Sequence, residues 1–220
     1  MLNYLYGYGN NFQGTIPLEI LKLPRLRYLE MDDNRFQGPI PTEVALLTSL
    51  ATLDLGYNQY SGELPTELAL MSTLTTLSLG GNDLTGAIPV DIILQMPKLR
   101  RLQLEDNFFT GTIPNRISLL TDLDVAFQLQ DNLLTGTIPT ELGRFRKLSQ
   151  DFDLSGNSLH GSIPTQLGWL SSLTDLRITD NNLTQAIPSE FGQLTSLSEY
   201  CHFVFVFVCL CSICLCVCLS

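Results

Sequence analysis

The amino-acid sequence predicts an α/β solenoid built from eight repeats. Asparagine recurs every 24 or 25 residues, and each asparagine closes a segment of the pattern Leu-x-x-Leu-x-Leu. That pattern has the period-2 alternation of a short β-strand. A dipeptide of Ile or Leu with Pro follows, and apolar residues then recur three apart, which suits a short helical turn. A repeat of this length indicates a solenoid, in which each unit buries its apolar face only against its neighbours.

The strand segments supply the core of the predicted solenoid. Inward-facing pairs such as Leu53 and Leu55 alternate with outward-facing polar residues. We expect successive strands to stack in parallel, about 4.7–4.9 Å apart, so that eight strands extend over roughly 33–34 Å. One additional residue precedes the strand between positions 123 and 127 and again between positions 148 and 152, and either insertion could bulge the strand start.

An asparagine ends each strand, where the chain turns inward. A buried amide needs its donors and acceptors satisfied, so we expect each asparagine to bond the backbone of its own turn and of the next repeat. Replacing one asparagine of this ladder would leave buried backbone groups without partners. The eight positions are Asn10, Asn34, Asn58, Asn82, Asn107, Asn132, Asn157 and Asn181.

Glycine and proline recur in the second half of each repeat. Glycine stands four residues after the asparagine in seven repeats, where it tolerates backbone angles that other residues resist. Gln185 breaks this column in the last repeat. Proline follows, for example at Pro139. Because proline fixes φ and cannot donate, it suits the position just before a short 3₁₀ or α turn on the convex side.

Together these residues resemble the plant-type leucine-rich repeat family. The resemblance covers residues 2–200 in eight successive copies, and the phrase Ile-Pro-Thr-Glu-Leu-Gly from Ile138 to Gly143 is typical of such repeats in plants and some algae. It implies a right-handed superhelix whose strands form a concave parallel β-sheet. It also implies that the chain is a fragment of a receptor-like or extracellular recognition protein, a class that includes receptor ectodomains and defence-related proteins.

The ends of the chain depart from the family pattern. The first residues hold neither a secretory signal nor the cysteine-paired cap that family members commonly carry, so we expect an uncapped N-terminus, where Gly7 replaces a strand leucine. The expected domains are a solenoid over residues 1–200 and an apolar, Cys-rich tail over residues 201–220. Residues 203–219 carry no charge, at the short limit of a membrane span, so the tail is either a membrane anchor or a gene-model artefact.

Composition and motif content argue against several classes of function. The net charge of −10 disfavours a nucleic-acid partner, because phosphate binding needs clustered Lys and Arg. All six cysteines lie between residues 201 and 218 among apolar neighbours, so we expect neither a disulfide framework in the repeats nor a metal site. His160, assigned to a convex-side turn, and His202, in the tail, belong to no catalytic set. We therefore expect no enzyme and no cofactor.

The outward strand positions predict that the concave face is the ligand surface. Four columns, taken six, four, two and one residues before each asparagine, hold eleven acidic and two basic residues among thirty-two positions. Tyrosines cluster with carboxylates at the N-terminal end, which suits a basic peptide or protein loop. The alternative is that this face is polar by default and that Asp54 and Asp153 serve the fold. The predicted ligand-binding residues are Tyr4, Tyr6, Tyr8, Tyr28, Glu30, Asp32, Asp54, Tyr57, Arg101, Asp153 and Arg177.

Two functions stay open at this level. The first is a protein-interaction module that binds a protein or peptide on its concave face, resembling receptor-like ectodomains in signalling or defence. The second is an intracellular or non-functional repeat fragment with no ligand of its own. By resemblance the location is extracellular or at a membrane, with residues 203–219 as the membrane contact, although the chain carries no signal peptide.

Overall fold

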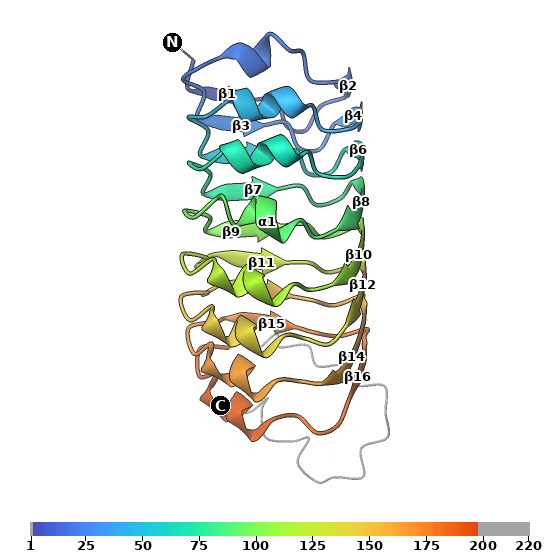
Figure 1. The fold of residues 1–220 in the computed structure, drawn as a ribbon, viewed down its shortest axis with the longest axis vertical. Helices are drawn as coiled ribbons and strands as arrows, with labels where there is room; N and C mark the ends of the chain where they lie inside the picture. The colour runs from blue at the N-terminus through green and yellow to red at the C-terminus, as the bar shows by residue number, and fades with distance from the viewer. Residues whose placement is uncertain (1, 198–220) are drawn as a thin grey trace.

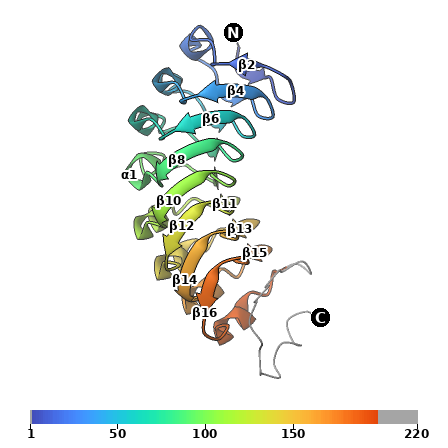
Figure 2. The same ribbon diagram turned by 90° about the vertical axis from the view of Figure 1, so that its right-hand side faces the viewer.

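A computed structural model describes residues 2–197, which form one continuous solenoid of stacked turns (Figure 1). Each turn contains a strand of a first sheet, a strand of a second sheet and a short helix. The stack curves, with the helices on its outer side and the strands of the first sheet on its inner, concave side (Figure 2). The predicted limit at residue 200 and both interpretations of the tail over residues 201–220 lie outside the described residues. No helix within residues 2–197 is long and apolar enough to cross a membrane.

The predicted strands form the first sheet, which is parallel and has eight strands in chain order. In its third strand Leu53 points inward and is fully buried, while Thr52 and Asp54 face outward and stay partly exposed. The register pairs equivalent residues of successive repeats, as with Leu53 and Leu77, so the strand leucines stack into one core. The strands are β1 (Tyr4–Tyr6), β3 (Tyr28–Glu30), β5 (Thr52–Asp54), β7 (Thr76–Ser78), β9 (Arg101–Gln103), β11 (Ala126–Gln128), β13 (Asp151–Asp153) and β15 (Asp175–Arg177).

A second parallel sheet, which the sequence analysis did not predict, follows the asparagines and also has eight strands (Figure 2). Its inward residues are the apolar ones two places after each asparagine, such as Phe109, which is 1% exposed. His160 lies exposed in this sheet, so its assignment to a convex-side turn was wrong. The strands are β2 (Gln13–Gly14), β4 (Arg35–Gly38), β6 (Gln59–Gly62), β8 (Asp83–Ala87), β10 (Phe108–Thr112), β12 (Leu133–Gly136), β14 (Ser158–Ser162) and β16 (Asn182–Thr184).

The predicted helical turns follow the prolines on the convex side. Seven are 3₁₀ turns and one is α, within residues 2–197. The α turn stands in the repeat that has one more residue between its proline and the next strand leucine, Pro89 to Leu99 instead of Pro65 to Leu74. The helices are η1 (Ile20–Lys22), η2 (Thr42–Leu46), η3 (Thr66–Leu70), α1 (Val90–Ile93), η4 (Asn115–Leu119), η5 (Thr140–Arg144), η6 (Thr165–Trp169) and η7 (Ser189–Gln193).

The two insertions before strands are absorbed without a change of register. Ahead of β11 the amides of Asp124 and Val125 donate to the same carbonyl, that of Arg100, at 3.3 and 3.0 Å. Ala126 then pairs with Arg101 on one side and Asp151 on the other, as equivalent residues do elsewhere in the sheet. The extra residue therefore alters the corner before the strand and leaves the outward-facing positions aligned.

The asparagine ladder is confirmed, but its side chains bond the preceding repeat. The Oδ1 atom of Asn107 accepts the amide of Leu84 at 3.0 Å, and its Nδ2 donates to the carbonyl of Leu79 at 3.0 Å. The same Nδ2 donates to carbonyls of its own turn, as expected. The prediction of a side-chain bond to the next repeat was wrong. The backbone amide of Asn107 already donates there, to Asp131 at 3.2 Å, which leaves the side chain for the repeat before it.

Seven asparagines, from Asn34 to Asn181, repeat this arrangement. Within residues 2–197 the side chain of Asn10 bonds only the carbonyls of Gly7 and Tyr8 in its own turn. Asn107 is 5% exposed, whereas Asn10 lies in the exposed class. The ladder therefore satisfies buried backbone groups in the middle of the stack, which is where an unpaired group costs most.

Candidate functional site

Four tyrosines cover the N-terminal end of the concave face. Tyr4 and Tyr28 are paired residues of β1 and β3, and their rings stack with centroids 4.7 Å apart and planes at 10°. Tyr6 lies 6.0 Å from Tyr4, and Tyr8 lies 6.3 Å from Tyr6. Tyr4, Tyr6 and Tyr8 are 50%, 54% and 56% exposed, so these rings offer apolar surface and hydroxyl groups together.

Three carboxylates continue this surface onto β3, its following turn and β5. Burial raises the pKa of Glu30, and the charges of Asp54 and Asp32 raise it further. Burial and the charge of Asp54 likewise raise the pKa of Asp32. Neither Glu30 nor Asp32 forms an ion pair with any residue in the range 2–197. We call Tyr4, Tyr6, Tyr8, Tyr28, Glu30, Asp32 and Asp54 the tyrosine–acid patch.

Asp54 and Asp153 also support the backbone, as the structural alternative held. Asp54 Oδ1 accepts the amide of Gly56 at 3.0 Å, and Asp153 Oδ1 accepts the amide of Ser155 at 2.9 Å. The two aspartates stand at the same repeat position and satisfy the same turn. A structural role for these two carboxylates is therefore confirmed.

The C-terminal end of the concave face differs from the tyrosine–acid patch, because two of its carboxylates form ion pairs with an arginine. Arg177 lies 3.6 Å from Asp153 and also pairs with Asp175. Arg101, in the middle of the face, lies 3.5 Å from the Gln103 side-chain oxygen. The structure thus brings Asp153 and Arg177 together, while four steps of the sheet, roughly 19 Å, separate them from the tyrosine–acid patch at β5.

The backbone conformation explains which residues stand directly before the asparagines. All eight of these residues have positive φ, between 50° and 67°. Glycine and aspartate tolerate this left-handed conformation better than most residues, so aspartates here do not by themselves indicate a ligand. Tyr57 is the exception, because it is a bulky residue held at φ 50° and 58% exposed. Such a residue in this conformation is strained, and strain of this kind clusters at functional sites.

Tyr57 faces a glycine pair in the next repeat, Gly80 and Gly81. A Cβ atom added to Gly81 would meet the Tyr57 ring, and a Cβ atom added to Gly80 would meet the Glu105 carboxyl group from the repeat beyond. We call Gly80 and Gly81, with Tyr57 and Glu105 above them, the glycine shelf. Sequence analysis missed Glu105 as a site residue. The signal was present, because a glutamate beside a glycine in the same column has room to fold over it.

Glu105 is the carboxyl group of the shelf, and its pKa lies well above the ordinary value. It is 4% exposed, and burial raises its pKa to about 7, helped by the charges of Asp106, Asp54 and Asp153. Its Oε2 atom has no hydrogen-bond partner among the described residues. The pKa of Tyr57 is also raised, by burial and then by the charges of Glu105, Asp106 and Asp54. No three His, Cys, Asp or Glu side chains within residues 2–197 are placed to hold a metal ion.

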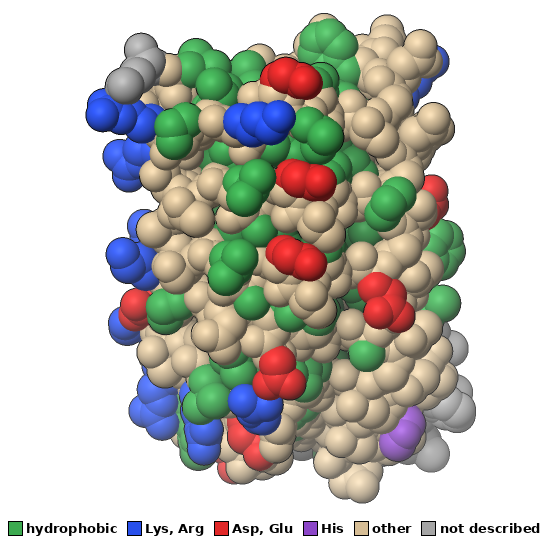
Figure 3. Space-filling view, turned by 45° about the horizontal axis from the view of Figure 1, so that its top comes forward, with side chains coloured by type: hydrophobic (Ala, Val, Ile, Leu, Met, Phe, Trp, Pro, Cys, Tyr) green, Lys and Arg blue, Asp and Glu red, His purple; other side chains and the backbone are tan. Residues whose placement is uncertain are grey.

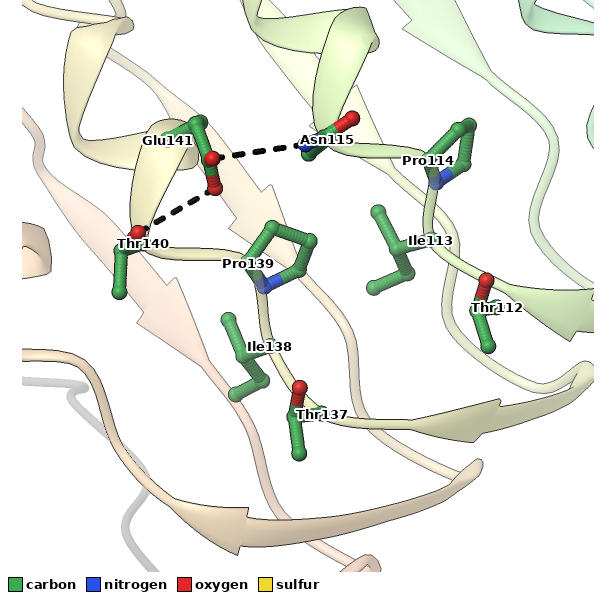
Figure 4. Close-up of a pocket in the computed structure, with 9 residues that line it drawn as sticks. All are labelled: Thr112, Ile113, Pro114, Asn115, Thr137, Ile138, Pro139, Thr140 and Glu141. Carbon is green, nitrogen blue, oxygen red and sulfur yellow. Dashed lines mark hydrogen bonds between the residues drawn. The ribbon is translucent and has the colours of Figure 1, made fainter.

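Away from the concave face the surface carries most of the basic residues and a groove. Lys and Arg side chains gather along one long edge of the molecule (Figure 3). A groove of about 500 Å³ lies between the Ile-Pro segments of two neighbouring repeats, where Thr140 and Asn115 donate to Glu141 at 3.2 and 3.4 Å (Figure 4). Its walls are the segments Thr112–Asn115 and Thr137–Glu141, and they belong to the frame that every repeat shares.

Comparison with known proteins identifies the family to which the repeats belong. The Leucine Rich Repeat family model matches residues 25–47, 73–93, 98–120, 150–170 and 172–194. No curated protein matches the chain in sequence. The chain is similar to the LRR ectodomain of the plant membrane receptor kinase GASSHO1/SCHENGEN3 from Arabidopsis thaliana, solved in complex with CASPARIAN STRIP INTEGRITY FACTOR 2. The identity is 36% and the TM-score 0.82, over 88% of this chain and 23% of that one.

Two further receptor structures show the same similarity. The plant peptide hormone receptor RGFR1, in complex with RGF2, is 32% identical with a TM-score of 0.78, over 89% of this chain and 35% of that one. The Arabidopsis receptor kinase HAESA, in complex with the peptide hormone IDA and the co-receptor SERK1, is 31% identical with a TM-score of 0.68, over 86% and 35%. The chain thus spans between about a quarter and about a third of the length of these structures.

Proposed function

The chain belongs to the leucine-rich repeat family, and from that membership we propose that it is part of a receptor-like recognition module whose concave face binds a basic peptide or protein loop. The tyrosine–acid patch is the principal contact surface in this proposal, with Tyr57 at its inner border. The module acts by binding and not by catalysis, and its place is extracellular or at a membrane.

One observation carries the proposal, namely that the patch concentrates negative charge and that neither Glu30 nor Asp32 forms an ion pair within residues 2–197. The charge of Asp54 raises the pKa of both Glu30 and Asp32, and the charge of Asp32 raises that of Glu30, so these carboxylates repel at neutral pH. A partner that brings Lys or Arg would relieve this repulsion, and complementary charge favours both association rate and specificity. Exposed tyrosine rings beside these carboxylates supply the aromatic contacts that dominate many interfaces.

The structural neighbours support the coarser part of the proposal. They are plant receptors solved in complexes, of which RGFR1 is a peptide hormone receptor and HAESA holds the peptide hormone IDA. Ligand binding by a solenoid of this fold is therefore well represented among similar structures. A leucine-rich repeat fold does not by itself name the partner, because function resides in the variable positions of a shared frame.

A displayed library of random twelve-residue peptides tests the proposal. We expect selection on the wild-type protein to enrich peptides rich in Lys or Arg with apolar neighbours. The triple variant Tyr28→Ala, Glu30→Gln, Asp32→Asn should bind the enriched peptides at least about tenfold more weakly, because it removes two charges and one ring that account for about 1.4 kcal/mol or more.

A matched variant on the helical side controls for charge and folding. Glu43→Gln, Leu46→Ala and Glu67→Gln also remove two charges and one exposed apolar side chain, at η2 and η3. This control should bind like the wild type, and both variants should keep the wild-type unfolding transition. Equal binding by the two triple variants would overturn the patch as the contact surface. Failure to enrich any basic peptide would favour the alternative, a repeat fragment with no ligand of its own.

A further inference from the structure

The glycine shelf lies nearer the middle of the concave face than the tyrosine–acid patch and has a different character. Its floor, Gly80 and Gly81, carries no side chain, so the neighbours on both sides close over it. Tyr57 comes from the preceding repeat and lies over Gly81, while the carboxyl group of Glu105 comes from the following repeat and lies over Gly80. An aromatic ring and a carboxyl group therefore lie over two adjacent glycines of one turn.

Two acceptor atoms at the shelf lack donors. Glu105 Oε2 has no hydrogen-bond partner among the described residues, although the side chain is only 4% exposed. Gln130, at the same position of the next repeat, likewise has a buried Oε1 atom without a partner within residues 2–197. Leaving a buried acceptor without a donor costs roughly 1–3 kcal/mol of stability. Two such acceptors in one column could both be satisfied by a group that carries several N–H donors.

The charges around the shelf indicate that such a ligand group should be positively charged. Asp54, Asp106 and Asp153 all act on Glu105 and disfavour its charged form. Arg101, the nearest basic residue along the face, acts on Asp54 and contacts Gln103, and its guanidinium forms no ion pair with Glu105. Tyr57, whose pKa the charge of Glu105 raises, adds no positive charge. The surroundings therefore favour a cation from outside the chain.

We propose that Glu105, Gln130 and the ring of Tyr57 form a subsite for one guanidinium group, supplied by an arginine side chain of the partner. A guanidinium group offers five N–H donors in a plane and no acceptor, so it can satisfy both orphan oxygens at once. Its face can also stack on an aromatic ring such as that of Tyr57. The subsite deepens the proposed function and rests on it, because it names the residue type that the partner must present at this point.

The proposal has a consequence for protons. An arginine that binds Glu105 favours the carboxylate, so binding must release the proton that the buried carboxyl group holds below about pH 7. The affinity for the arginine group should therefore be about tenfold higher at pH 8 than at pH 6, since the ionised fraction of Glu105 rises about tenfold across that interval.

The test uses Nα-acetyl-arginine amide as the probe and its neutral isostere, Nα-acetyl-citrulline amide, as the reference. Carbon-13 NMR of the Glu105 carboxyl group follows its pKa in the wild-type protein. We expect the arginine probe to lower this pKa by about two units or more at saturation, as the tenfold change in affinity requires, and the citrulline probe to leave it unchanged. An unchanged pKa with both probes, or equal shifts with both, would overturn the subsite.

Variants then assign the contacts. Glu105→Gln should bind the arginine probe at least about tenfold more weakly at pH 8 and lose the pH dependence, and Tyr57→Leu should weaken binding about threefold at either pH. Glu63→Gln removes an equivalent charge away from the shelf and should bind as the wild type does. If the arginine probe fails while basic peptides still bind through the patch, the subsite alone is wrong. If the probe binds but the library selects no basic peptide, the proposed function alone is wrong.

Discussion

The first repeat and the central repeats share one backbone frame but treat equivalent positions differently. In the first repeat Tyr4, Tyr6 and Tyr8 are about half exposed, and the side chain of Asn10 bonds no repeat but its own within residues 2–197. In the central repeats the equivalent side chains include Gly80 and the buried Glu105, and the asparagines bond the preceding repeat as well. The end of the stack thus presents a broad exposed surface, whereas its middle holds a buried, unpaired group. Three measurements test this contrast, ordered by the size of the effect expected.

The largest effect is expected from the ladder. Asn107→Ala removes bonds to Leu84, Leu79, Leu104 and Glu105, and leaves buried backbone groups unpaired. Because each orphaned group costs roughly 1–3 kcal/mol, we expect a loss of about 3 kcal/mol or more in the free energy of unfolding, measured in urea. Asn10→Ala should cost less than about 1 kcal/mol, because the exposed side chain of Asn10 bonds carbonyls of its own turn and none of another described repeat. Similar losses in the two variants would contradict the contrast between end and middle.

The second effect is a dependence of stability on pH that centres on Glu105. Its folded pKa, about 7, lies above the ordinary value of 4.5, so its stabilising contribution is fully present below pH 4.5 and is lost as pH rises through 7. The shift corresponds to about 3 kcal/mol at most. We expect the wild type to unfold more readily in urea at pH 8 than at pH 5, and Glu105→Gln to lose most of that difference.

Glu30 provides the control for this pH dependence. Its pKa is also raised, but the side chain is more exposed, so Glu30→Gln should leave most of the pH dependence in place. If Glu30→Gln and Glu105→Gln flatten the pH profile equally, the buried group at the middle of the face is not its main source.

The smallest effect concerns two residues held in the left-handed region where most repeats have glycine or aspartate. Gln185 has φ 69° in the glycine column of the second sheet, and Tyr57 has φ 50° in the column before the asparagines. Replacing either with glycine should raise the free energy of unfolding by about 0.5–1 kcal/mol, as relief of strain is partly offset by the entropy of glycine. Only Tyr57→Gly should weaken binding of the arginine probe. A Gln185→Gly variant that also lost binding would argue against a local role for Tyr57.

Local residue patterns were sufficient to predict the strands, the helical turns and the existence of the ladder. The alternation of Leu53 and Leu55 with polar residues predicts a strand. Pro65 predicts the start of a helical turn, because its ring restricts φ. The second sheet was missed because its segments, such as Gln59–Gly62, are short and polar and become strands only by pairing with neighbouring repeats. The direction of the ladder was missed because it depends on which carbonyls the backbone amides have already taken.

The candidate site, too, was predicted from the sequence only in part. Sequence spacing placed Tyr4, Tyr6 and Tyr28 on one face, because side chains two apart in a strand point to the same side and equivalent repeats stack in register. It did not show that Arg177 neutralises Asp153, that Tyr57 is strained, or that Glu105 folds over Gly80. Those features depend on burial, on backbone dihedral angles and on distances between repeats.

The sequence by itself therefore determined the frame of this protein, because its repeat length, strand period and asparagine spacing admit one way of burying the leucines. The tertiary structure decided which charges are paired and which are buried alone, because the stacking of repeats sets the dielectric surroundings and the neighbours of each carboxyl group. Glu105 is an ordinary glutamate in the sequence, and its burial over Gly80, with three aspartates acting on it, raises its pKa to about 7 in the stack.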